Sequence, residues 1–326
     1  MRDYLERLLA GNLPSATGIR VEDLAEIEGG WETDIYRFDL AYRQSGESHS
    51  TELVARFYAG PRGADRAIRE AAVLRAIARA GIPVPEVEFE SVEVSQHGTA
   101  VVVMERVSGE VLATTLGSDE LTADMARGLA AVHRLPVTEV FGGQSQPFAE
   151  PGFVPPDVAS MAAAVDQHGS AEFRPVIDWL TASGPVEHEP CVLHNDYHAD
   201  NIIVRDRDGG LVIIDWSFAA AGDYRLDLAW TALWTGAAGG SDSRTKLLAA
   251  YEEAANTTVT DLEYFEALKL GSRLLTVSSW LTGSVAPPVA KITRSAIRTD
   301  YKPTLMTVYA RFHEVTGIPI PLIENL

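Results

Sequence analysis

The sequence predicts an α+β protein with two lobes: a small first lobe built on an antiparallel sheet with one main helix, and a larger second lobe that is mainly helical. Three observations predict this fold class. Short β-branched and aromatic runs, separated by glycine and polar turns, fill most of the first lobe. One long helical stretch interrupts these runs. Beyond residue 105, apolar residues recur mostly at helical spacing. The predicted lobes are residues 1–105 and 106–326.

The first three strands are predicted to form an antiparallel meander, because Gly-Gly and polar turns separate runs that follow one another directly. The predicted helix ends in the usual way, with Gly81 just beyond it and Pro83 shortly after. The predicted elements of this lobe are strands at 23–28, 34–42, 52–58, 86–94 and 99–104 and a helix at 63–80.

In the second lobe, Leu121, Met125, Leu129 and Val132 recur at helical spacing and predict its first helix. Residues 137–153 are rich in glycine and proline and predict a loop. Further helices are predicted at 157–167, 174–182, 226–235, 243–255, 261–281 and 301–316.

Charge and cysteine content exclude several classes of protein. The 326 residues contain 27 Lys and Arg against 46 Asp and Glu, a net charge of −19. Such a surface repels nucleic acid and anionic lipid, so neither is an expected partner. The single cysteine, Cys191, excludes an internal disulfide and a cysteine zinc cluster. No apolar run approaches the roughly 18 residues of a membrane span, and a cytoplasmic protein is expected. The sequence does not predict an oligomeric state.

Two apolar runs in the second lobe predict a β-hairpin with chemistry at its open end. The runs Ile202–Val204 and Leu211–Ile214 flank a polar linker that contains the turn signal Asp-Gly-Gly. Asn201 precedes the first run and Asp215 follows the second, so pairing brings them to about 5 Å at the backbone. An amide oxygen beside a carboxylate suits Mg²⁺, which also takes water and substrate phosphate as ligands.

A polar loop precedes this hairpin. Asp196 stands five residues before Asn201, so the loop can fold back toward the predicted metal pair. A carboxylate there can accept the proton of an attacking hydroxyl. The order base, amide and carboxylate matches the layout of the protein kinases.

Three motifs carry a family resemblance: His194-Asn195-Asp196-Tyr197-His198-Ala199-Asp200-Asn201, then Ile214-Asp215-Trp216, then Gly222-Asp223-Tyr224-Arg225-Leu226-Asp227-Leu228-Ala229. Their order and spacing resemble the aminoglycoside phosphotransferase and choline kinase superfamily. The resemblance implies a two-lobed protein-kinase-like fold, ATP, Mg²⁺ and phosphate transfer to a small-molecule hydroxyl. It implies that Asp196 is the catalytic base and that Asn201 and Asp215 are metal ligands. Asn195 replaces the usual glycine, which we expect to be tolerated if its backbone is not left-handed.

Three further residues of these motifs are expected to support the site. His194 is predicted to be a hydrogen-bonding scaffold of the loop, whereas His198 is either scaffold or active-site contact. Asp227 is expected to tie the catalytic loop by hydrogen bonds.

The first lobe is expected to hold the nucleotide. Arg56 lies inside an apolar strand, and Glu70 lies on the apolar stripe of the following helix, so the two can neutralise each other. This pair resembles the strand lysine and helix glutamate of kinases, with arginine in place of lysine; a plain structural salt bridge is the alternative. Gly29 and Gly30 resemble the family's turn over the phosphates, although a simple hairpin turn is the alternative. The backbone of Glu105 and Val107 is placed where the family's hinge meets the adenine.

The acceptor and the nucleotide are less well defined. The resemblance implies ATP or, alternatively, GTP. An aminoglycoside-like antibiotic is favoured as the hydroxyl acceptor because acidic residues near the C-terminal third could bind a polycation: Glu252, Glu253, Asp261, Glu263 and Glu266. Trp230, Trp234 and Trp280 could instead form a pocket for a macrolide, choline or another amino alcohol, and a sugar is also possible.

Two other functions compete with the kinase. A metal-dependent hydrolase could use His194, Asp196 and His198, although the sequence has no H-E-x-x-H motif. The arginine at position 56 leaves room for a non-catalytic nucleotide-binding module.

Overall fold

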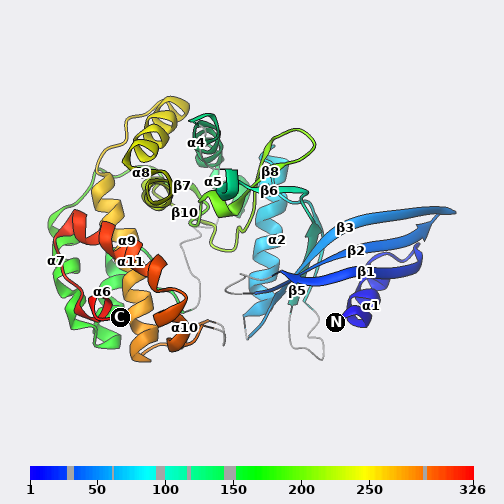
Figure 1. Cartoon of the computed structure of the whole chain (residues 1–326), viewed down its shortest axis with the longest axis horizontal. Helices are drawn as coiled ribbons and strands as arrows, with labels where there is room; N and C mark the ends of the chain where they lie inside the picture. The colour runs from blue at the N-terminus through cyan, green and yellow to red at the C-terminus, as the bar shows by residue number, and fades with distance from the viewer. Residues whose placement is uncertain (28–32, 61, 93–99, 116–118, 143–151, 289–291) are drawn as a thin grey trace. The chain divides into compact units, whose positions relative to one another are not determined.

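The computed structural model describes the chain except for residues 28–32, 61, 93–99, 116–118, 143–151 and 289–291. The chain divides into two compact units, Met1–Ser108 and Gly109–Leu326 (Figure 1). The predicted boundary after residue 105 falls close to this division.

A five-stranded antiparallel sheet forms the first unit, in the order β1-β2-β3-β5-β4. The predicted meander is confirmed, but its first strand starts earlier than expected. Register shifts interrupt β1, and Asp23 has a left-handed φ of 46°. These irregularities break the alternation by which a strand is recognised in a sequence. The strands are β1 (Thr17–Ile27), β2 (Asp34–Gln44), β3 (Glu47–Tyr58), β4 (Val87–Ser91) and β5 (Ala100–Glu105).

A helix packs on each face of this sheet. Leu5 and Leu9 of α1 (Arg2–Asn12) join a buried apolar cluster with alternate residues of β3, including Leu53 and Phe57. The opposite face of β3, with Arg56 and Tyr58, lies toward α2 (Gly63–Arg79). A Cβ at Gly63 would lie 2.2 Å from the Tyr58 carbonyl oxygen, so only glycine lets α2 start this close to the strand.

Two small sheets lie in the second unit. The predicted hairpin is confirmed, with Ile202 of β8 (Ile202–Arg205) opposite Ile213 of β9 (Leu211–Ile213). A short strand, β6 (Gly109–Val111), extends it, and β7 (Cys191–Leu193) pairs with β10 (Ala220–Gly222). The three-residue strands β6, β7 and β10 carry too little periodicity to be predicted from sequence, whereas the turn signal before β9 marked that strand.

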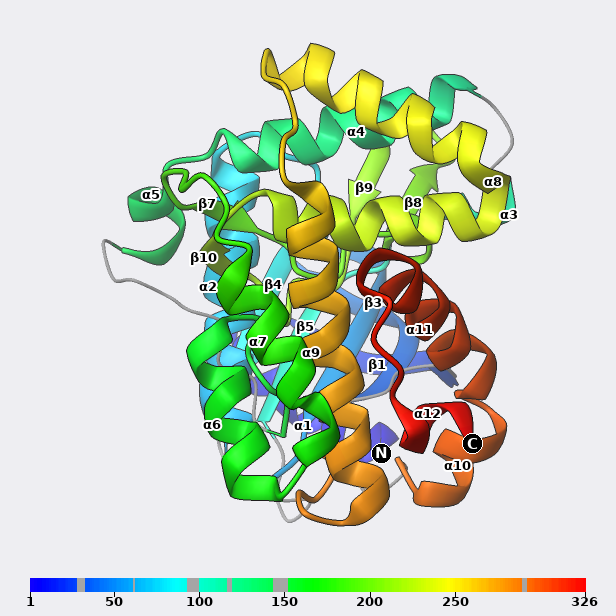
Figure 2. The same cartoon turned by 90° about the vertical axis from the view of Figure 1, so that its left-hand side faces the viewer.

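Helices make up the rest of the second unit, around the central α9 (Leu262–Thr282). Figure 2 shows α6 and α7 on one side of α9 and α11 on the other. Together they bury most of the unit's apolar residues in one cluster. The other helices are α3 (Leu112–Thr115), α4 (Asp119–His133), α5 (Val137–Phe141), α6 (Val158–His168), α7 (Arg174–Ala182), α8 (Arg225–Ala255), α10 (Arg294–Thr299), α11 (Lys302–Thr316) and α12 (Pro321–Glu324).

The two helices predicted at 226–235 and 243–255 are confirmed. Both lie within α8, whose backbone leaves the helical conformation between them at Gly240, where φ is 80° and ψ is −179°. Residues 137–141 of the predicted loop form α5, and residues 143–151 lie outside the described part. The short helices α3, α10 and α12 were not predicted. Among the described helices, none combines the length and apolar character needed to cross a membrane.

Glu266, one of the acidic residues considered for acceptor binding, holds three helices of the second unit together. Its fully buried carboxylate on α9 pairs with Arg311 of α11 at 2.5 Å and with Arg244 of α8 at 2.8 Å. Asp261 likewise pairs with the buried Arg225 at 3.3 Å, and Glu252 accepts the Val259 N–H at 2.7 Å. These three acidic groups therefore serve the fold.

Removing the charge of Glu266 should destabilise the protein. Glu266→Gln leaves two partly buried guanidinium groups without their shared carboxylate, and we expect a loss of about 2–4 kcal/mol in the free energy of unfolding. Urea unfolding measures this loss. Glu263→Gln, on the exposed side of the same helix, is the matched control and should change stability by less than about 0.5 kcal/mol. Equal effects of the two substitutions would contradict a structural role for Glu266.

Candidate active site

The open end of the β8–β9 hairpin brings the two predicted metal ligands together. The Asn201 carbonyl accepts the Ile214 N–H at 2.9 Å, so Asn201 lies beside the backbone that leads directly into Asp215. Asp215 has a left-handed φ of 61°, and its carboxylate accepts the Ser217 hydroxyl at 2.8 Å. Hairpin pairing thus places the amide and the carboxylate at one strand end.

The carboxylate of Asp196 is held from several sides and remains about a quarter exposed. One oxygen accepts the Trp230 indole N–H at 2.8 Å, and the other accepts the Asn201 amide at 3.0 Å. That amide also donates to the Asp196 carbonyl at 2.9 Å. Since the nitrogen of the Asn201 side chain points to Asp196, its oxygen is the atom that can face a cation.

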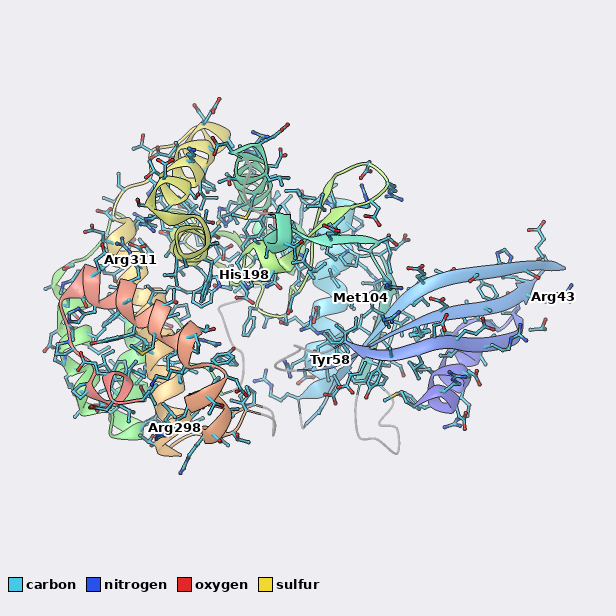
Figure 3. All side chains as sticks on the ribbon, viewed as in Figure 1. Arg43, Tyr58, Met104, His198, Arg298 and Arg311 are labelled. Carbon is cyan, nitrogen blue, oxygen red and sulfur yellow. The ribbon has the colours of Figure 1, made fainter. Side chains whose placement is uncertain are left out.

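Electrostatics keep Asp196 ionised. Burial by itself raises the pKa of Asp196, but the facing His198 ring, together with His194 and Arg273, outweighs burial and holds the pKa well below its usual range. His198, labelled in Figure 3, lies 3.5 Å from Asp196 and 3.3 Å from Asp200. Burial by itself lowers the pKa of His198, but these carboxylates raise it to about 10. These two shifts favour an imidazolium facing a carboxylate. The Asp200 N–H, 3.3 Å from Nδ1, and the Asn201 amide nitrogen, 3.3 Å from Nε2, also lie against the ring.

Asp227, fully buried near the start of α8, anchors the loop that carries Asp196. Its carboxylate accepts the backbone N–H groups of His194 at 2.8 Å and of Asn195 at 2.6 Å. His133 of α4 approaches the same carboxylate at 3.1 Å and joins it to the Tyr251 hydroxyl. Burial by itself raises the pKa of Asp227, but the His133 contact, together with Lys269 and His194, outweighs burial and lowers the pKa.

His194 has both ring nitrogens occupied inside the loop. Its Nε2 lies 3.0 Å from the Ile214 carbonyl, and its Nδ1 faces the Asp196 N–H at 3.3 Å. The ring is fully buried beside Trp216, and burial lowers the pKa of His194. A neutral ring bonded at both nitrogens cannot also bind a metal, so the trio His194, Asp196 and His198 lacks one hydrolase ligand.

The condition under which we expected asparagine to replace glycine at position 195 is not met, because the Asn195 backbone is left-handed, with a φ of 66°. Asparagine adopts this conformation more readily than other residues with a Cβ. Its side chain also forms contacts that glycine cannot form: the amide nitrogen donates to the Phe218 carbonyl at 3.0 Å. The Lys269 ammonium of α9 donates to the Asn195 side-chain oxygen at 3.0 Å and to its carbonyl at 2.9 Å. Burial lowers the pKa of Lys269 to about 8.

The first unit contains the predicted pair of Arg56 and Glu70, which lie 2.7 Å apart and are both buried. Arg56 also donates to the Thr33 hydroxyl at 2.8 Å, and the Tyr58 hydroxyl donates to Glu70. The contacts of Thr33 and Tyr58 were not anticipated from the sequence. These contacts fix the Arg56 guanidinium and the Glu70 carboxylate of α2 beside Tyr58, which is labelled in Figure 3, at the end of β3.

The other residues predicted to contact the nucleotide are the two glycines of the first turn and the two residues of the expected hinge. Gly29 and Gly30 lie outside the described residues. Glu105 ends β5, and its N–H already donates to the Glu86 carbonyl at 2.8 Å. Val107 follows in irregular backbone and is half-buried.

The residues at the hairpin end fit a hard divalent cation. Asn201 and Asp215 supply an amide and a carboxylate oxygen at one strand end, which are ligand types that Mg²⁺ accepts alongside water and phosphate. Within the described residues, no cluster of three or more His, Cys, Asp or Glu could hold a metal by itself. Substrate phosphate and water would have to complete such a site.

A kinase-like fold with this loop and hairpin defines a class of phosphotransferases, and comparison with known proteins agrees. The phosphotransferase enzyme family model matches residues 23–267. The chain therefore belongs to this family.

Two curated relatives are longer proteins. Over 171 residues the chain is 26% identical to acyl-CoA dehydrogenase family member 11 of Gallus gallus. This match covers 50% of this chain and 22% of that protein. Over 252 residues it is 25% identical to acyl-CoA dehydrogenase family member 10 of Mus musculus, covering 71% and 22%. The matches thus span about a fifth of the length of these relatives.

Solved structures share the fold at low sequence identity. A provisionally named aminoglycoside phosphotransferase from Ralstonia eutropha JMP134 has a TM-score of 0.67 at 19% identity, covering 97% of this chain and 99% of that one. A point mutant of an aminoglycoside 2′-phosphotransferase IIIa, in complex with GDP, scores 0.61 at 15% identity, with 97% and 98% covered. An amicoumacin kinase with AMP-PNP, Ca²⁺ and amicoumacin scores 0.58 at 11% identity over the full length of both chains.

Several residues around the site escaped the sequence analysis. Trp230 was considered as pocket lining, but its bond to Asp196 was not foreseen, and Lys269 was not singled out at all. Both come from helices far along the chain from the loop that they contact. Nothing in their local sequence marks them, apart from a lysine within an apolar helical segment at position 269.

Asp227→Asn should destabilise the protein at neutral pH. The amide would leave one buried backbone N–H without its acceptor, and we expect a loss of about 2–4 kcal/mol. Because the folded-state pKa of Asp227 is lowered, its contribution is present above the ordinary carboxyl pKa and is lost as the pH falls through the folded value. Urea unfolding at pH 7, 5 and 3 measures the difference in the free energy of unfolding between the parent protein and Asp227→Asn. This difference should become smaller only at pH 3. The exposed Asp206→Asn is the control.

Substitutions at Asn195 separate backbone strain from side-chain contacts. Asn195→Gly and Asn195→Ala both remove the bonds to Phe218 and Lys269, but only alanine is strained at a φ of 66°. We therefore expect the alanine variant to be less stable than the glycine variant by about 1–2 kcal/mol. Urea unfolding of the two proteins measures the difference, and equal stabilities would argue against the left-handed backbone.

Proposed function

We propose that the protein is a small-molecule O-phosphotransferase that uses ATP, or alternatively GTP, together with Mg²⁺. The observation that carries the proposal is the joint geometry of three side chains: the partly exposed Asp196 carboxylate, the Asn201 amide bonded to it, and Asp215 at the adjoining strand end. Base, amide and carboxylate are the groups that phosphoryl transfer requires, because its catalysis rests on positioning and electrostatics.

In this proposal Asp196 is the catalytic base. Its lowered pKa keeps it ionised, so it accepts a hydrogen bond from the acceptor hydroxyl and aims the oxygen at the phosphate. The bonds from Trp230 and Asn201 fix the carboxylate before the acceptor binds. The proton of the hydroxyl passes to Asp196 as the new oxygen–phosphorus bond forms and the bond from the γ-phosphorus to the departing nucleoside diphosphate breaks.

The remaining roles are assigned to residues that the sequence predicted. Asn201 and Asp215 would hold Mg²⁺, which neutralises charge on the transferred phosphate when bound. Arg56, with Glu70 fixing its orientation, would bind nucleotide phosphates in the first unit, where arginine offers a bidentate contact. The relatives bound to GDP and to AMP-PNP with Ca²⁺ support a nucleotide and a divalent cation.

The hydrolase alternative loses support, because the ring nitrogens of His194 are both bonded within the loop. The preference for a polycationic acceptor is also weakened, because Glu266, Asp261 and Glu252 are bonded within the fold. Aminoglycosides therefore stand as one acceptor class beside macrolides, amino alcohols and sugars.

An ADP-release screen with ATP and GTP against these acceptor classes tests the proposal. Asp196→Asn and Asp215→Asn should each lower kcat by about 100-fold or more, because one removes the base and the other a ligand charge. The exposed Asp206→Asn should retain full activity. Both site variants should keep the far-UV circular dichroism of the parent. Full turnover in both would refute the assignment, as would transfer that survives EDTA.

A further inference from the structure

Among the described residues, Arg273 is a cation beside the catalytic loop that pairs with no carboxylate. It lies on α9, one helical turn after Lys269 and on the same side of the helix. It forms no salt bridge within the described part of the chain, and its hydrogen bond goes to the Tyr301 hydroxyl at 3.3 Å. The side chain is half-buried. A guanidinium that is partly withdrawn from water and has no carboxylate partner keeps N–H donors that can bind further hydrogen-bond acceptors.

Aromatic rings hold this guanidinium in place. Its central carbon lies 5.2 Å from the ring centre of Phe153 and 5.9 Å from that of Trp280. The two rings meet edge-on at 5.1 Å, and the Trp280 indole N–H donates to the Gly152 carbonyl at 2.9 Å. A guanidinium held by aromatic faces has its donor fork pre-oriented, which lowers the entropy lost when it binds a planar or tetrahedral anion.

Direct contacts connect this aromatic corner to the catalytic loop. Phe153 packs edge-on against Phe218 at 5.3 Å, and the Phe218 carbonyl accepts the Asn195 amide next to Asp196. Arg273 is also near enough to Asp196 to contribute to its electrostatic stabilisation. The guanidinium is therefore connected, through Phe153 and Phe218, to the loop that carries Asp196.

Charge favours an anion over a cation at this place. Arg273 and the Lys269 ammonium are neighbouring positive groups in a chain whose net charge is −19. The acidic residues Glu266, Asp261 and Glu252, which could have attracted a cation, are bonded elsewhere. A guanidinium has five donors and no acceptor, and carboxylates and phosphates match its fork.

We propose that Arg273 binds an anionic group of the acceptor, a carboxylate or a phosphate, so that the acceptor is a hydroxylated organic anion. This inference rests on the proposed function and specifies that the acceptor carries a negative charge. Arg273 is a specificity-determining residue in this account, while Asp196 does the chemistry. The anion would lie against the Phe153 and Trp280 corner, with the hydroxyl of the same molecule at Asp196.

Matched acceptor pairs test the charge preference: glycerate and glycerol 3-phosphate against glycerol, gluconate against glucose, with ethanolamine and kanamycin as cations. For the preferred acceptor, Arg273→Gln should raise KM about tenfold or more while kcat and the KM for ATP stay within about twofold. Arg273→Lys should fall between. Arg298→Gln is the matched control, because Arg298 is an exposed residue of α10 that lies away from His198 (Figure 3). Preference for neutral or cationic acceptors would overturn the proposal, as would a loss confined to kcat or to the KM for ATP.

A binding measurement decides the matter even if no acceptor of the panel is phosphorylated. Gluconate and glycerol 3-phosphate should raise Tm above the value in sodium chloride of equal ionic strength, because ligands that bind the folded state stabilise it. This rise should be lost in Arg273→Gln and retained in Arg298→Gln. The same rise in both variants, or no rise in the parent protein, would overturn the anion site. Failure of transfer with an Arg273-dependent rise would instead count against the proposed phosphotransferase.

Discussion

The carboxylate of Asp227 holds the conformation on which the candidate active site depends. It accepts two consecutive backbone N–H groups, from His194 and Asn195, at the point where the chain leaves β7 and turns into the loop of Asp196. His133 supplies the opposing polar contact from a third segment. A fully buried carboxylate is costly unless every oxygen is bonded, so these three donors and Asp227 require one another. This anchor fixes the backbone at His194 and Asn195, and the side-chain contacts of Asn195 and Asp196 add to it.

Positive groups and hydrogen-bond donors surround the Asp196 carboxylate. His198 and Arg273 favour its ionised form, and the Trp230 and Asn201 donors use up part of its hydrogen-bonding capacity. An ionised carboxylate with fixed neighbours is a weak base but a good positioning group. This agrees with phosphoryl transfer, in which the protein mainly orients the reactants and stabilises developing charge.

Asn195 shows how a departure from a family motif can be accommodated. A glycine there would need no support, whereas asparagine in the same backbone conformation gains two bonds that cross-link the loop to Phe218 and to α9. The Lys269 that completes this cross-link also places α9 beside the loop, and the next turn of the same helix presents Arg273. In our account one face of α9 therefore both supports the catalytic loop and selects the acceptor.

The sequence by itself determined the elements with strong local signals. These are the meander, the long helices, the β8–β9 hairpin, and the facing positions of Arg56 and Glu70, since periodicity and turn residues act over a few positions. Order and spacing along the chain also selected Asp196, Asn201 and Asp215 as a group. Tertiary structure decided which charged side chains form ion pairs within the fold, as Glu266 does. It also decided that distant helices bring Trp230, Lys269 and Arg273 close to the loop of Asp196. Those contacts join residues that are many positions apart in the sequence. Burial and packing determine the partners and the protonation states of these residues, and no local sequence pattern encodes burial or packing.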